Sequence, residues 1–131
     1  MLLVKTRLAM SPIEGIGVFA DEFIPKGTTT WKFIPEYDQL LTPATVEAAI
    51  EPIRSTLLRY SYLDSRTGLY IFCVDNGRFV NHADNPNTRG QYEAIDAFGR
   101  DIAIRDIEIG EELTCDYREF DLDHKLKLSV P

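Results

Sequence analysis

The residues best suited to chemistry are concentrated in one segment, residues 78–87, which reads RFVNHADNPN. An apolar pair runs directly into a cluster of amides with one imidazole, and an Asn-Pro step then disfavours helical geometry. We therefore expect Asn81, His82 and Asn87 on a turn that the apolar pair anchors in the core. Groups held in this way either hydrogen-bond a small polar ligand or tie loops together. Asn87 is expected to brace the turn from within.

Two further segments carry candidate groups. Residues 110–117 read GEELTCDY and end in Tyr117, which alone would be a buried tyrosine with a satisfied hydroxyl. Residues 15–20 read GIGVFA, and Gly15 and Gly17 allow close backbone approach or positive φ. Without further context that second segment is equally compatible with a hairpin turn that binds nothing.

In their order and spacing, the three segments resemble the signature segments of the SET-domain protein-lysine methyltransferases, over roughly residues 3 to 121. The resemblance implies a mostly β fold of small curved sheets with a small helical insert and a C-terminal pseudoknot. It implies one SET domain over residues 1–131, with the variable insert at about residues 38–66. Residues 118–131 would form a tail in place of the cysteine-rich zinc module that follows the domain in many members.

The resemblance also implies an activity, the transfer of a methyl group from S-adenosyl-L-methionine to a lysine amine of a basic protein, histone or histone-like. The catalytic residue would be Tyr117, whose hydroxyl would orient the methyl group. The implied cofactor-binding residues are Gly15, Ile16, Gly17, Asn81 and His82, and those of the substrate channel are Tyr62, Cys115 and Phe120.

Several departures from the family pattern keep a second interpretation open. Ala83 and Asp84 replace a common Ser-Cys, and Cys115 stands where members carry Phe or Tyr, so the number of methyl groups added stays open. A Tyr-x-Gly common after the third strand is missing, which leaves the role of Tyr37 undefined. The alternative is a catalytically degenerate SET module that binds a basic peptide or partner protein.

The amino-acid composition argues against a nucleic-acid-binding, a membrane-spanning and a metal-binding protein. The 131 residues carry a net charge of −7 with a pI near 4.8, which repels phosphate backbones and would attract a Lys/Arg-rich partner. On charge alone, the simpler interpretation is that a moderate negative charge keeps the protein in solution. No apolar run approaches the roughly 18 residues of a membrane span. Cys73, Cys115 and two histidines provide no metal-ligand spacing, so we expect no metal. We expect an intracellular protein, in a bacterial cytoplasm or a host nucleus, and leave open a homodimer that covers strand edges.

Local patterns predict many short strands and little helix. Strands are expected at residues 2–10, 18–23, 28–34, 60–63, 69–74 and 112–116, and a hairpin from residues 92–98 and 101–107 that turns at 98–100. Trp31 and Phe33 share one face and are expected in the core. A helix should begin at Thr42-Pro43 and break at Pro52, with residues 46, 50, 53 and 57 on one face. The tail could add a short helix.

Overall fold

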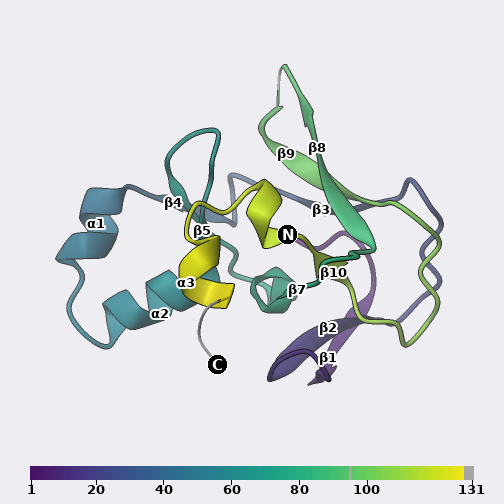
Figure 1. Ribbon diagram of the computed structural model, residues 1–131. Coiled ribbons are helices and arrows are strands. Elements are labelled where there is room, and N and C mark those ends of the chain that lie inside the picture. The colour runs from purple at the N-terminus through teal and green to yellow at the C-terminus, as the bar shows by residue number, and fades with distance from the viewer. Residues whose placement is uncertain (95, 129–131) are drawn as a thin grey trace.

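The computed structural model describes residues 1–94 and 96–128 and shows short strands in four small sheets with a few short helices (Figure 1). One sheet is the antiparallel hairpin β1 (Thr6–Met10) and β2 (Ile16–Ala20). A second has the order β3 (Thr29–Lys32), β9 (Asp96–Ala103), β8 (Thr88–Glu93). A third has the order β4 (Gln39–Leu41), β6 (Tyr70–Phe72), β5 (Ser61–Leu63). The fourth is a parallel pair, β7 (Asn81–His82) and β10 (Thr114–Cys115).

The helices lie mainly in the insert and the tail. They are α1 (Pro43–Ala48), α2 (Ile53–Tyr60), α3 (His124–Leu128) and the 3₁₀ turns η1 (Asn76–Phe79) and η2 (Tyr117–Glu119). The side chain of Thr42 caps α1 by accepting a hydrogen bond from the Thr45 amide at 3.1 Å. The predicted start of the helix, its break at Pro52 and the tail helix are confirmed.

The expectation of one continuous apolar face across this break is wrong. Val46 is buried, but Ile50 and Ile53 are 73% and 52% exposed. The chain leaves helical geometry after α1, so the spacing of four and three residues no longer places these side chains above one another.

The core consists of two buried clusters that fix the candidate segments. One contains Ala20, Ile24, Ala103, Ile107 and Leu113. It joins β2 and β9 to the segment that leads into β10. The other contains Trp31, Phe33, Ile71 and Cys73, so the predicted core positions of the two aromatic residues are confirmed. Each fully buried aliphatic side chain contributes about 1.5–3 kcal/mol relative to exposure.

The predicted hairpin turn at residues 98–100 is wrong. Strand β9 continues through Gly99, and β8 pairs with it from Glu93 opposite Asp96 to Thr88 opposite Ala103. Gly99 has a φ of +66°, and a Cβ there would lie 2.5 Å from Cδ1 of Tyr92. The glycine therefore makes room for a cross-strand ring rather than reversing the chain. Ile95, which falls in the predicted strand 92–98, lies outside the described residues.

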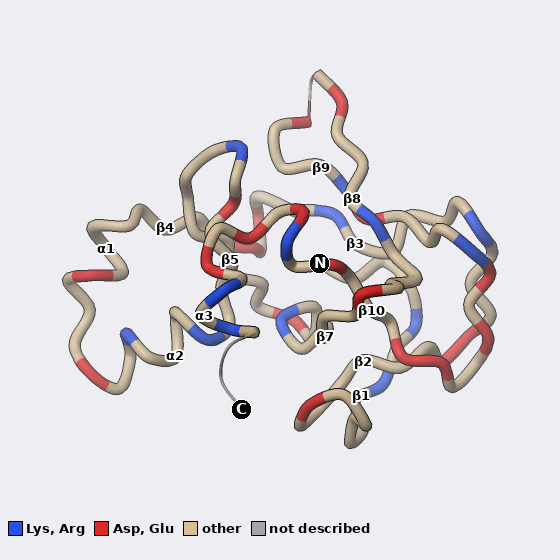
Figure 2. Tube along the Cα trace, in the orientation of Figure 1, with Lys and Arg blue, Asp and Glu red and all other residues tan. Residues whose placement is uncertain are grey.

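Other boundaries differ in smaller ways. Strand β2 begins at Ile16, so Gly17 lies within a strand instead of ahead of one. Strand β4 has no counterpart among the predicted elements. Within residues 1–94 and 96–128, no helix is both long and apolar enough to cross a membrane. Figure 2 shows acidic residues recurring along the trace from the insert to the tail, so charge alone does not localise a groove for a basic ligand.

Candidate functional site

The parallel pair β7–β10 brings the first two sequence segments side by side. Asn81 is paired with Thr114 and His82 with Cys115, and the Ala83 amide donates to the Cys115 carbonyl at 3.0 Å. Because β10 leads directly into η2, this pairing places the amide and imidazole side chains next to Tyr117.

Asn87 locks the pairing from within. It is 1% exposed, its Oδ1 accepts the Thr114 amide at 2.9 Å, and its Nδ2 donates to the Glu112 carbonyl at 2.8 Å. An asparagine side chain is needed for this, because one amide group supplies both a donor and an acceptor to an adjoining backbone. The prediction that Asn87 braces the turn is confirmed.

Asn81 ties the glycine-containing loop to the same region. Its Nδ2 lies 3.1 Å from the Glu14 carbonyl, 3.2 Å from the Ile16 carbonyl and 2.9 Å from Oε1 of Glu112. A Cβ on Gly17 would lie 1.9 Å from that same Oε1. Gly17 is therefore required by the Glu112 carboxylate, which fills the space where a side chain would begin.

Glu112 is a residue that the sequence reasoning missed. Besides Asn81, it accepts a hydrogen bond from the Ser11 hydroxyl at 2.9 Å, so one carboxylate connects the β1–β2 hairpin, β7 and the segment before β10. The only signal in the sequence was its place in the GEEL segment, which says nothing about a contact with a residue 101 positions earlier.

The His82 side chain accepts a hydrogen bond from the backbone amide of Tyr117 and so helps to position that residue. Its Nδ1 accepts the Tyr117 amide at 3.1 Å, which requires that nitrogen to be unprotonated, while Nε2 lies 3.3 Å from Asp84. Asp116 lies 3.5 Å from the same ring. The bidentate hydrogen bonds from the Arg118 guanidinium, at 2.8 and 2.7 Å, hold the pKa of Asp116 below its ordinary value. Among the described residues no cluster of ligands suits a metal ion.

Tyr117 presents its hydroxyl as a neutral hydrogen-bond donor. The hydroxyl donates to the Val80 carbonyl at 2.5 Å, and burial raises the pKa of the phenol far above its ordinary value. Its ring packs against His82 at 5.4 Å and Phe120 at 6.1 Å between centroids. Such a tyrosine cannot serve as a phenolate base near neutral pH, but it can orient a group placed beside it.

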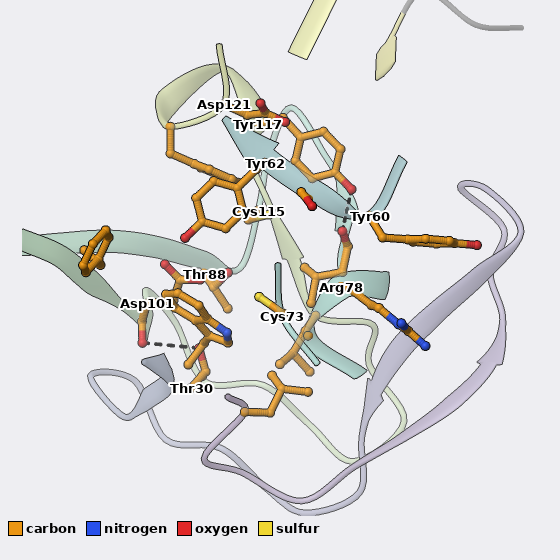
Figure 3. A pocket seen from close by; sticks show the side chains of 18 of the residues that line it. Thr30, Tyr60, Tyr62, Cys73, Arg78, Thr88, Asp101, Cys115, Tyr117 and Asp121 are labelled. Carbon is orange, nitrogen blue, oxygen red and sulfur yellow. Dashed lines mark hydrogen bonds between the residues drawn. The ribbon is translucent and has the colours of Figure 1, made fainter. Parts of the chain in front are cut away.

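Tyr117 also lines a cavity of about 100 Å³ (Figure 3). Tyr62, Cys115 and Phe120, the three predicted channel residues, all line it together with Tyr117. The Tyr62 ring packs edge-on against Phe120, with centroids 5.0 Å apart. Burial raises the pKa of the Cys115 thiol well above its ordinary value, so the wall at this position is apolar.

Beside the cavity, the tail contains an ion pair between Lys127 and the buried Asp121. The Lys127 ammonium, on α3, donates to Oδ2 of Asp121 at 2.6 Å and also to the Ser61 carbonyl of β5. The Asp121 side chain is 1% exposed and its other oxygen accepts the Leu63 amide at 3.1 Å. The tail is thereby fastened to the insert, and Lys127 itself lines the cavity.

The predicted site residues fall into two neighbouring groups. Asn81 is joined to the loop that contains Gly15, Ile16 and Gly17, and the neighbouring His82 is joined to Tyr117, but none of these five residues lines the cavity. Tyr62, Cys115 and Phe120 line it, and Tyr117 connects the two groups. The side chains of Asn81 and His82 are used within the protein, so their main effect is to hold the loop and Tyr117 in place.

Comparison with known proteins places this arrangement in a family. The SET domain family matches residues 15–118. Histone-lysine N-methyltransferase trr of Drosophila melanogaster is 30% identical over 139 residues, covering 91% of this chain and 5% of that protein. Histone-lysine N-methyltransferase trithorax of Drosophila virilis is 33% identical over 133 residues, covering 87% of this chain and 3% of that protein. The chain thus spans only a small part of the length of these relatives.

The fold agrees with solved structures. Chaetomium thermophilum Polycomb Repressive Complex 2 bound to GSK126 aligns with a TM-score of 0.67 at 24% sequence identity, over 96% of this chain and 17% of that one. The predicted mostly β fold is confirmed, and the chain belongs to the SET domain family.

Proposed function

We propose that this domain is an S-adenosyl-L-methionine-dependent protein-lysine N-methyltransferase. The observation that carries the proposal is the position of Tyr117, whose neutral hydroxyl is fixed on the Val80 carbonyl at the wall of a small aromatic cavity. Family membership and relatives named as histone-lysine methyltransferases support it.

The chain offers groups that fit the cofactor. The Arg78 guanidinium makes no ion pair among the described residues, lines the cavity and lies against the rings of Phe79 and Tyr60 at 5.0 and 5.4 Å. A carboxylate suits such a cation, and the aromatic faces suit a sulfonium or an adenine. Gly15, Ile16 and Gly17, held by Asn81, would provide the adjoining wall. S-adenosyl-L-methionine supplies, when bound, a methyl group on positively charged sulfur.

The protein itself would remove water from around the reacting amine and align the amine for attack. A free lysine has a pKa near 10.4 and must be neutral to attack. The aromatic walls formed by Tyr62 and Phe120 disfavour the charged amine, whose proton leaves to solvent. Tyr117 then fixes the approach from one side, and alignment of this kind supplies several kcal/mol of the barrier.

The parts of the chain take distinct roles in this proposal. Residues 38–66 act as the variable insert that frames the substrate, and residues 118–131 act as the tail that completes the channel. The Lys127–Asp121 pair and the Ser61 contact support the second role, because they fasten tail to insert. A basic protein substrate, histone or histone-like, suits the net charge of −7. The compartment and a homodimer stay predictions, and the sequence pattern made no prediction of the number of methyl groups added.

Calorimetric titration with S-adenosyl-L-methionine tests the proposal. The wild-type chain should bind near micromolar, about −8 kcal/mol. Asn81→Ala should weaken binding at least about tenfold, because it releases the 15–17 loop. Asn85→Ala, at an exposed amide, is the matched control and should bind like wild type. Circular dichroism verifies that all three chains are folded.

Absence of binding by the folded wild-type chain would contradict the proposal. The degenerate module that binds a basic peptide would then become the better account.

A further inference from the structure

Several polar groups that line the cavity have no hydrogen-bond or ion-pair partner among the described residues. They include the carboxylate of Asp101 and the hydroxyls of Tyr62 and Tyr92. Figure 3 shows the Tyr62 ring extending toward the end of the cavity where Asp101 lies. A mostly apolar cavity with a few converging polar groups is the usual form of a ligand site.

The position of Asp101 is fixed by its strand. It lies in the centre of the three-stranded sheet, paired with Trp31 of β3 and Gly90 of β8. Its backbone carbonyl accepts the Thr30 hydroxyl at 3.3 Å (Figure 3). The pairing fixes the backbone of Asp101 on both sides, and its side chain lines the cavity.

A carboxylate that lines a mostly apolar cavity is stabilised when a cation binds beside it. Burial raises the pKa of Asp101 to about 7, because its charge is poorly solvated there. The groups that face it are Tyr62, Tyr92, Cys115, Glu119 and the amino-terminal ammonium. Apart from that ammonium, none of these groups is cationic. Arg59, Arg78 and Lys127 also line the cavity, but none of them forms an ion pair with Asp101 among the described residues, and Lys127 is paired with Asp121.

We propose that Asp101 is the residue that recognises the N–H groups of the amine entering the cavity. The inference rests on the proposed function and deepens it. The aromatic walls fit a methylene stem, and the carboxylate accepts hydrogen bonds from the amine at its end. Each methyl group added to nitrogen replaces one N–H, so Asp101 selects for amines with few methyl groups.

Asp101 is a recognition residue and not the general base. An amine that enters from water has a pKa near 10.4, well above the pKa of about 7 of Asp101, so it arrives as an ammonium that donates hydrogen bonds to the carboxylate and keeps its proton. The carboxylate instead strengthens binding of the amine. Replacement by Asn should therefore weaken amine binding without removing a reacting group.

Small amines test this without knowledge of the substrate protein. n-Butylammonium and n-butyltrimethylammonium are titrated at pH 8 into wild type, Asp101→Asn and Asp21→Asn, followed by NMR. Asp21 is exposed and does not line the cavity, so it controls for the loss of one charge.

Wild type and Asp21→Asn should prefer n-butylammonium by about tenfold or more, the effect of a hydrogen bond to a charged group. In Asp101→Asn that preference should fall to near one. Equal preference in all three chains, or no amine binding by wild type, would overturn the inference. The amine titration needs no cofactor, so a negative result in it can be distinguished from a failure of the chain to bind S-adenosyl-L-methionine.

Discussion

Replacing Asp101 by Asn should stabilise the fold in a pH-dependent way. Asn has nearly the same shape as Asp but carries no charge at any pH, so the variant avoids placing a charge against the apolar cavity. The effect on stability should be visible regardless of what the cavity binds.

The magnitude follows from the two pKa values. The carboxyl has an ordinary value of 3.8 and a folded value of about 7, so the folded protein holds this proton more tightly than the unfolded chain. Well below the unfolded pKa of 3.8 both states are mostly protonated, and the carboxyl then contributes no pH-dependent difference in stability. As the pH rises from about 4 to 7 the unfolded state ionises first, and wild type loses up to about 4 kcal/mol relative to the variant.

Urea unfolding at pH 4 and pH 8, followed by the fluorescence of the single, buried Trp31, measures this difference. The stability of Asp101→Asn relative to wild type should increase by about 3–4 kcal/mol between the two pH values. Asp21→Asn, which removes an exposed charge, should follow wild type within about 0.5 kcal/mol. A constant difference between Asp101→Asn and wild type across this range would refute the reasoning.

Three further substitutions test the contacts that assemble the site. Asn87→Ala should cost about 3 kcal/mol in urea unfolding, because it leaves a buried backbone amide and carbonyl without partners. Gly17→Ala should cost about 1–3 kcal/mol and weaken cofactor binding, because the new Cβ displaces the Glu112 carboxylate. Lys127→Met should cost about 3 kcal/mol and speed hydrogen exchange in the tail, because a buried carboxylate loses its cation.

Each of these has a matched comparison. Asn85→Ala, at an exposed amide two residues away, should change stability by less than about 0.5 kcal/mol. Gly17→Ala and Glu112→Ala disturb the same Glu112 contacts, so their losses of cofactor affinity should not add in the double variant; additive losses would contradict the steric argument. Lys125→Met should leave tail exchange unchanged, since Lys125 makes no ion pair among the described residues. Exchange equally fast in both lysine variants would contradict the role of Lys127.

The sequence was informative where the relevant interactions are local or belong to contiguous segments. Alternation placed Trp31 and Phe33 in the core, and a proline after a capping threonine marked the start of α1. The grouping of Asn81, His82 and Tyr117 followed from segments whose order and spacing match one family.

The sequence was not informative where the role of a residue depends on a contact with a residue far away in the chain. Gly99 looked like a turn residue, but its small size serves the ring of Tyr92 on the neighbouring strand. The roles of Glu112 and Lys127 depend on contacts with residues far away in the sequence. Asp101 fell in an irregular hairpin whose predicted turn was misplaced, so its orientation toward the cavity could not be predicted.

The central claim is that Tyr117 is the catalytic residue of a lysine methyltransferase. The rate of methyl transfer by the Tyr117→Phe variant tests it most directly. Recombinant histone H3 and S-adenosyl-L-methionine are incubated with wild type, Tyr117→Phe and Tyr37→Phe, and lysine methylation is followed by mass spectrometry. Tyr37 is 64% exposed and does not line the cavity, so its loss of a hydroxyl is the matched control.

Wild type and Tyr37→Phe should methylate lysine at the same rate. Tyr117→Phe should be slower by about a hundredfold or more, as expected for misalignment of the reacting groups, while still binding the cofactor. Equal rates for Tyr117→Phe and wild type, or cofactor binding by wild type without lysine methylation, would contradict the account.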